Sequence, residues 1–169
     1  MKWFAPIFAL VICYAIFFAY VVSSYDDLPL RLATHFNLEG RPNGWMSRDG
    51  FVEFSIGFCT LMPAFIVGVM SMTGWIPVSF VNLPHRDYWL APERRKATSA
   101  LLLRYALWFA CMNVLFITGV HWMVVQANDP IHGVRLSGLG MVFVAGTFLL
   151  GTGIWVSLVV QRFNKTDAL

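Results

Sequence analysis

The chain alternates between four long apolar stretches and three more polar connections. Each apolar stretch has roughly 20 or more residues with almost no charge, and a helix of that length spans about 30 Å, the thickness of the hydrocarbon layer of a bilayer. Backbone groups in lipid must be hydrogen-bonded within the segment, and the alternation typical of a membrane β-barrel is missing from the sequence. The pattern therefore predicts helices over about residues 3–24, 51–76, 98–125 and 136–160.

The predicted fold is an all-α transmembrane four-helix bundle that forms one integral membrane domain over residues 1–169. Residues 25–50 are expected to form a structured outer loop between the first two helices. Residues 77–104 form a basic inner segment, and residues 126–135 a short outer turn. The first stretch has the charged start of a signal peptide, but its apolar core is long and no small-residue cleavage site follows, so it is interpreted as a membrane span.

Composition favours a membrane protein over other classes. The chain is 58% hydrophobic and 12% charged, with a mean hydropathy of +0.65, whereas a soluble domain has about 25% charged residues. A fold of this size in water buries only about 70% of its surface, which argues against a soluble enzyme. A disordered protein and a coiled coil are excluded by the same composition. The net charge of +3 is a mild excess, so no nucleic-acid partner is expected.

The distribution of lysine and arginine predicts the orientation. An even number of spans puts both termini on one side of the membrane. On the side of the termini we expect Lys2, Arg86, Arg94, Arg95, Lys96, Arg104, Arg162 and Lys165, and on the other side Arg31, Arg41, Arg48 and Arg135. Because basic residues concentrate on the cytoplasmic side, both termini are predicted to be cytoplasmic.

The inner segment between the second and third helices is a candidate contact surface, formed by Arg86, Trp89, Arg94, Arg95 and Lys96. One interpretation is that these cations set the topology and contact anionic membrane lipids. The alternative is that they dock a cytosolic partner. The run Tyr88-Trp89-Leu90 between charged residues predicts a short segment lying in the membrane interface.

The outer loop carries a pattern with fixed spacing, Leu-Pro-x-Arg-x-x-Thr-His-Phe-Asn-x-x-Gly-x-Pro-x-Gly-Trp. Its dipeptides Glu39-Gly40 and Asn43-Gly44 are typical of turns, and the alternation around Phe36 predicts a short strand in a small hairpin. The pattern resembles a bacterial membrane domain of unknown function found at the N-terminus of SdpI-type proteins. The matching residues are Leu28, Pro29, Thr34, His35, Phe36, Asn37, Gly40, Pro42 and Trp45.

The resemblance covers residues from about 10 to 75 and implies a protein of the bacterial cytoplasmic (inner) membrane. SdpI is a toxin-immunity protein that also signals by holding a repressor at the membrane. The resemblance therefore implies immunity or sensing by contact with a peptide toxin or another membrane protein. The expected contact residues in the outer loop are Thr34, His35, Phe36, Asn37, Gly40, Pro42 and Trp45.

Two residues of this loop also have a simpler interpretation. His35 and Asn37 are expected to organise the loop through hydrogen bonds to the backbone. A metal site would need three or four ligands, and His132 in the other outer connection is the one further histidine expected nearby. No metal site is predicted.

Polar residues inside the apolar stretches are few. Asn113, near the middle of the third stretch, is interpreted as an interhelical hydrogen-bonding group. His121 is conceivable as a haem ligand, but the other stretches hold no partner histidine, so no cofactor is predicted. The three cysteines lie in apolar runs and are interpreted as small buried side chains.

Small residues recur on two of the predicted helices. They lie at i, i+7 and i+11, as Gly57, Ala64 and Gly68 in the second helix and as Gly146, Gly153 and Ser157 in the fourth. Small residues let helix backbones approach closely. The two faces are expected to pack against each other or against another protein, and Pro63 is expected to bend the second helix.

Together these patterns predict a non-catalytic membrane protein that acts by contact, since the sequence contains no motif typical of a catalytic site. The leading hypothesis is an SdpI-like protein of immunity or sensor type. One alternative is an accessory transmembrane subunit of a larger respiratory or photosynthetic complex. A second is a small transporter, which is disfavoured because the spans lack Asp, Glu or Lys near the membrane midplane.

Overall fold

A computed structural model describes residues 4–129, 131 and 133–166. It contains four long helices, two short strands and three short helical turns. In chain order these are α1 (Phe4–Ser24), β1 (Arg31–Phe36), β2 (Pro42–Ser47), α2 (Arg48–Ser71), η1 (Met72–Gly74), η2 (Val78–Phe80), α3 (Arg86–Trp89), α4 (Arg95–Ala127) and α5 (Gly138–Phe163). Residues 1–3, 130, 132 and 167–169, which include Lys2 and His132 of the sequence predictions, lie outside the described part.

The four long helices are each long and apolar enough to cross a membrane, which supports a multi-pass membrane protein. Their ends differ by a few residues from the hydropathy prediction because polar side chains begin two of them. Ser47 caps α2 by accepting a hydrogen bond from Gly50 N at 3.1 Å. Ser137 caps α5 in the same way, through Gly140 N at 3.1 Å. Such caps satisfy backbone groups outside the apolar stretch, where hydropathy carries no signal.

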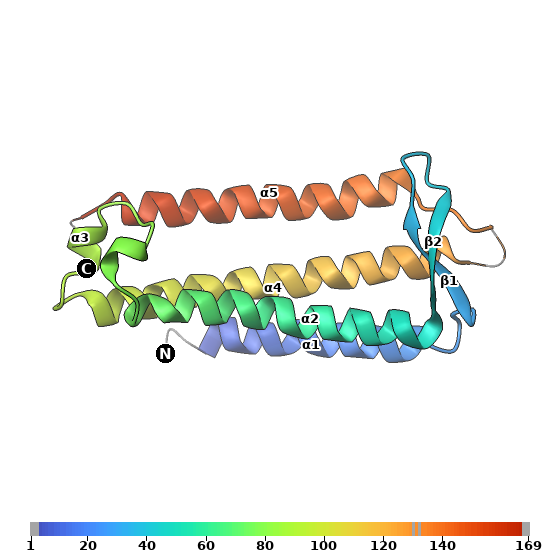
Figure 1. Cartoon of the computed structure of the whole chain (residues 1–169), viewed down its shortest axis with the longest axis horizontal. Helices are drawn as coiled ribbons and strands as arrows, with labels where there is room; N and C mark the ends of the chain where they lie inside the picture. Colours follow the sequence, from blue (N-terminus) through green and yellow to red (C-terminus); the bar gives the residue numbers. More distant parts are fainter. Residues whose placement is uncertain (1–3, 130, 132, 167–169) are drawn as a thin grey trace.

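The four helices run lengthwise, with the strand pair at one end and α3 at the other (Figure 1). We call these the hairpin end and the basic end. Helix α4 is central and contacts α1, α2 and α5. Helix α5 packs against α4 alone over most of its length, and its only buried residue is Phe163. Within the predicted set of four helices, the fold is therefore a three-helix core with a fourth helix on one side.

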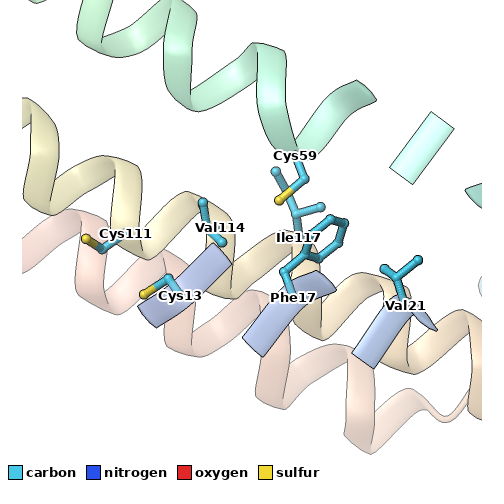
Figure 2. Packing of buried hydrophobic residues seen from close by; sticks show 7 residues of the cluster. All are labelled: Cys13, Phe17, Val21, Cys59, Cys111, Val114 and Ile117. Carbon is cyan, nitrogen blue, oxygen red and sulfur yellow. The ribbon is translucent and has the colours of Figure 1, made fainter. Parts of the chain in front are cut away.

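The main apolar core lies where α1, α2 and α4 meet. Figure 2 shows its seven buried side chains, which come from α1 (blue), α2 (green) and α4 (yellow): Cys13, Phe17, Val21, Cys59, Cys111, Val114 and Ile117. All three cysteines are free thiols within or beside this core. They contribute apolar volume, as their sequence context predicts.

The predicted contact between the small-residue faces of α2 and α5 is wrong. A Cβ atom added at Gly57, Gly68, Gly146 or Gly153 would meet no atom within 4 Å, and Ala64 and Ser157 are exposed. The faces point out of the molecule because α4 occupies the space between the two helices. Their packing against another protein stays a prediction.

Two other glycines make the close approach of α4 and α5. A Cβ at Gly119 would lie 3.1 Å from Val144 Cγ1, and one at Gly151 would lie 2.8 Å from Met112 Cε. The spacing of small residues therefore missed this contact, because it selected α2 in place of α4 and another face of α5.

Candidate functional site

The two strands form an antiparallel hairpin at one end of the bundle. Arg31 pairs with Ser47 and Phe36 with Pro42, with register shifts on both sides of His35. The turn therefore comprises residues 37–41, and the predicted turn dipeptide Asn43-Gly44 instead lies inside β2. Gly44 is needed there because a Cβ would lie 2.9 Å from His35 Cβ.

Asn37 organises the turn through its side chain. Its Oδ1 accepts hydrogen bonds from the backbone N–H groups of Glu39 at 3.1 Å and Arg41 at 2.8 Å. This is the backbone role predicted for Asn37. His35 differs, since the contact of its ring is with a side chain, Nδ1 lying 3.3 Å from Thr34 Oγ1.

Gly40 joins the turn to the connection between α4 and α5. Its φ of 75° lies in the left-handed region, which favours glycine. Its carbonyl accepts a hydrogen bond from Leu136 N at 3.0 Å, and a Cβ at this position would lie 2.5 Å from Leu136 O. Gly40 is buried, so its role is to hold the hairpin in place, which differs from the predicted contact role.

Asn128 fixes the other part of the hairpin. This buried residue follows α4, and its Oδ1 accepts a hydrogen bond from Ala33 N while its Nδ2 donates to Ala33 O, both at 2.8 Å. The same Nδ2 donates to Val124 O at 2.8 Å. One amide thus satisfies both backbone groups of a strand residue. The sequence prediction missed Asn128 because its position after an apolar run is equally typical of a helix end.

Five of the exposed side chains of the hairpin form what we call the hairpin surface: His35, Leu38, Arg41, Asn43 and Trp45. Leu38 is fully exposed and Trp45 is 45% exposed. Of the predicted contact residues, His35, Asn37 and Trp45 are exposed, and Thr34, Phe36 and Pro42 are half-buried. Exposed apolar side chains on a rigid, polar-rimmed element are typical of contact sites.

A hollow of about 600 Å³ lies beside the hairpin surface. The turn residues Asn37 and Glu39 line one side, and Gln126, Arg135 and Leu139 line the other. Arg135 also reaches across the gap, with its Nη2 donating to Glu39 O at 3.4 Å. The exposed side chains of the hairpin surface therefore lie next to a hollow.

His121 forms a polar cluster within the membrane-spanning part. Its Nδ1 lies 3.1 Å from Ser55 Oγ and its Nε2 lies 3.5 Å from Ser24 Oγ. The ring stacks on Phe51 with centroids 4.8 Å apart, and it is 2% exposed. The cluster thus connects α1, α2 and α4. Both ring nitrogens face serine hydroxyls, an arrangement that fits interhelical hydrogen bonding.

The basic end is built differently from the prediction. Trp89, expected at the surface, is fully buried, and its Nε1 donates to Phe163 O at 2.8 Å. Leu90 is also buried and Tyr88 is half-buried, so most of the Tyr88-Trp89-Leu90 segment packs into the fold. The reason is that Trp89 fills the space between α4 and the end of α5, where it contacts Phe163 edge-on at 5.1 Å.

The predicted cations of this end have separate roles. Arg94 lies over the Tyr88 ring at 4.0 Å and donates to Tyr88 O at 3.0 Å. Arg95 donates to the carbonyls of Thr73 and Ile76. Arg86 and Lys96 are exposed. These contacts show that arginine side chains hold the connection between α2 and α4 in place.

A metal site finds no support in the described residues, where no group of three His, Cys, Asp or Glu side chains comes close enough to hold an ion. His132, the possible partner of His35, lies outside them.

One family model matches part of the chain. Residues 7–57 match a domain of unknown function (DUF1648), a segment that runs from α1 through the hairpin into α2. Neither a curated protein nor a solved structure matches the chain.

Proposed function

We propose that this protein is a non-catalytic protein of the bacterial inner membrane that acts by protein contact through the hairpin surface. The proposed type is SdpI-like immunity or sensing, with a peptide toxin or another membrane protein as partner. The match over residues 7–57 is consistent with the N-terminal domain of such proteins, and it includes the hairpin.

The observation that carries this proposal is the way the hairpin is held. Asn128 binds both backbone groups of Ala33, and Leu136 N binds Gly40 O. Because these bonds use backbone groups of the hairpin, the exposed side chains of Leu38 and Trp45 are left for a partner. A preorganised surface lowers the entropy lost on binding.

The excess of basic residues at the opposite end supports an orientation with that end and both termini in the cytoplasm. The hairpin surface then faces outward, where a secreted peptide arrives.

A protection assay tests the proposal. A strain lacking the protein is complemented with the wild type, Trp45→Ala or Leu38→Ser, and is challenged with peptides secreted by the same species. The wild type should restore survival and the two variants should not, although they reach the membrane in equal amounts. Equal survival with and without the protein would contradict an immunity role.

A photocrosslinking amino acid extends this test to sensing. Placed at position 38, it should capture the partner, whereas the same group at position 96, at the basic end, should not. Capture at both positions or at neither would argue against contact through the hairpin surface.

An accessory subunit of a larger membrane complex is the second candidate. It is favoured by the outward small-residue faces of α2 and α5, and by a hollow of about 480 Å³ on α5 lined by residues that include Gly153 and Ser157. Mild detergent extraction separates the two candidates. Migration with a large respiratory or photosynthetic assembly would favour the subunit, and migration as a monomer or small oligomer would favour the contact protein.

A further inference from the structure

The connection between α2 and α4 exposes three large apolar side chains at the basic end. Met72 is 58% exposed, Trp75 is 90% exposed and Phe80 is 77% exposed. Together with the exposed cations Arg86 and Lys96, we call them the connector surface. Tryptophan and other aromatic residues at the ends of membrane spans concentrate at the level of the lipid head groups.

Arginine side chains hold the exposed aromatic residues in position. Arg95 Nη2 donates to Thr73 O at 3.4 Å and also to Ile76 O, and these two carbonyls flank Trp75. Arg86 Nη1 donates to Ser79 O at 3.3 Å, next to Phe80. Arg95 and Arg86 thus hold the backbone beside Trp75 and Phe80 in place.

The charge of this connection is unbalanced. Residues 72–97 contain four basic residues and two acidic ones. Asp87 lies 3.7 Å from Arg86, and Glu93 lies 3.6 Å from Arg94, as neighbours in sequence. The acidic residues therefore offset two of the cations, and the positive charges of Arg95 and Lys96 are left uncompensated.

We propose that the connector surface binds anionic phospholipid, with Trp75 and Phe80 at the acyl boundary and the uncompensated cation Lys96 at the lipid phosphates. Two features favour lipid over a protein partner. The surface is continuous with the membrane-spanning helices, since α2 ends at Ser71 and α4 begins at Arg95. Its composition, aromatic side chains beside cations, is that of interfacial membrane-binding segments. This proposal is independent of the proposed function of the hairpin surface.

Lipid retention in native mass spectrometry tests the cationic part. The protein is reconstituted in vesicles of equal amounts of phosphatidylglycerol and phosphatidylcholine and is then extracted in detergent. The wild type should retain phosphatidylglycerol in several-fold preference. Removal of one cation in Lys96→Ala should lower that preference about fivefold, as expected from about 1 kcal/mol per basic residue near an anionic surface.

Arg41→Ala is the matched control, because it removes an exposed cation from the hairpin end. It should leave the preference unchanged. Equal retention of the two lipids by the wild type, or the same loss in Arg41→Ala as in Lys96→Ala, would overturn the proposal. The proposal would also be overturned if the wild type copurified with an acidic protein in place of phosphatidylglycerol and Lys96→Ala did not.

Fluorescence quenching tests the aromatic part. The difference between the emission of the wild type and that of Trp75→Phe is the emission of Trp75. In vesicles whose acyl chains carry bromine this emission should be strongly quenched, whereas aqueous iodide should quench it weakly. The opposite result would place Trp75 in water and overturn the proposal. Because Trp75 is 90% exposed, Trp75→Phe is expected to fold.

Discussion

The hairpin end and the basic end of this molecule are held together by different chemistry. At the hairpin end the hydrogen bonds are made to the backbone of the hairpin. The Asn128 side chain binds the N–H and C=O of Ala33, and Leu136 N donates to Gly40 O. At the basic end the donors are the large side chains of Trp89 and Arg95, which bind the carbonyls of Phe163, at the end of α5, and Ile76, in the connection after α2. The hairpin end therefore keeps its exposed side chains available for contact, whereas the basic end uses much of its chemistry to close the fold.

Removing the amide that fixes the hairpin should destabilise the fold strongly. Asn128→Ala leaves the buried N–H and C=O of Ala33 without their partner, and each unsatisfied group costs about 1–3 kcal/mol. We expect a loss of about 3 kcal/mol in the free energy of unfolding, with faster hydrogen exchange over residues 31–47.

Asn43→Ala is the control, because Asn43 is exposed in the same hairpin. It should change stability by less than about 0.5 kcal/mol. A similar loss in both variants would mean that the hairpin is not fixed through Asn128.

Substitutions at two glycines separate the stability lost through a steric clash at the docked turn from the stability lost through backbone strain. Gly40 and Gly133 both have φ of 75°, but a Cβ at Gly40 would lie 2.5 Å from Leu136 O, whereas one at Gly133 would meet nothing within 4 Å. Gly133→Ala should cost about 1–2 kcal/mol from the left-handed backbone. Gly40→Ala should cost about 1–3 kcal/mol more from the steric overlap.

Thermal unfolding of the two glycine variants in detergent measures this difference. Equal shifts in Tm would contradict a close contact between the turn and the α4–α5 connection.

A tryptophan pair gives the corresponding comparison at the basic end. Trp89→Phe removes the hydrogen bond to Phe163 O from a fully buried position, and we expect a cost of about 1–2 kcal/mol. Trp75→Phe, at a 90% exposed position, should be nearly neutral. If Trp89→Phe and Trp75→Phe both unfold at the wild-type temperature, the hydrogen bond of Trp89 does not stabilise the basic end.

The smallest effect concerns pH at the hairpin end. The Tyr25 hydroxyl donates to Asp49 Oδ1 at 2.5 Å, and this hydrogen bond to a carboxylate, aided by desolvation, raises the pKa of Tyr25 above its usual value of 10.0, with Arg48 opposing the shift. A raised pKa in the folded state means that the bond stabilises the fold below pH 10 and is lost as pH rises beyond it.

Titration of phenolate absorbance in wild type and Tyr25→Phe gives the pKa of this group by difference. A midpoint at or below the ordinary tyrosine value would contradict the hydrogen bond.

Hydropathy predicted the membrane-spanning helices because each crosses the same thickness of hydrocarbon. It misjudged the start of α4, which begins at Arg95, since Arg95 and Lys96 extend the helix beyond the apolar stretch. The burial of Trp89 was not predictable either, because a tryptophan between charged residues has the same local sequence whether it lies in the interface or fills the fold.

The candidate site was predictable in part. The spacing of Asn37 and Gly40 marks a local turn, in which Asn37 binds neighbouring backbone groups and Gly40 supplies the positive φ. The contact of Gly40 with Leu136 is long-range and was not predictable from this spacing. Asn128 and Ala33 are far apart in the chain, and the pairing of His121 with Ser24 and Ser55 depends on how three helices pack. No local pattern encodes these contacts, so they required the tertiary structure.

Labelling of introduced cysteines in intact cells tests the central claim, that the hairpin surface faces outward and the basic end faces the cytoplasm. The native cysteines are buried, and Leu38 and Lys96 are exposed at opposite ends. Leu38→Cys should react with a membrane-impermeant maleimide in intact cells, and Lys96→Cys should react only after the membrane is opened. Labelling of Lys96→Cys but not of Leu38→Cys in intact cells would contradict the account.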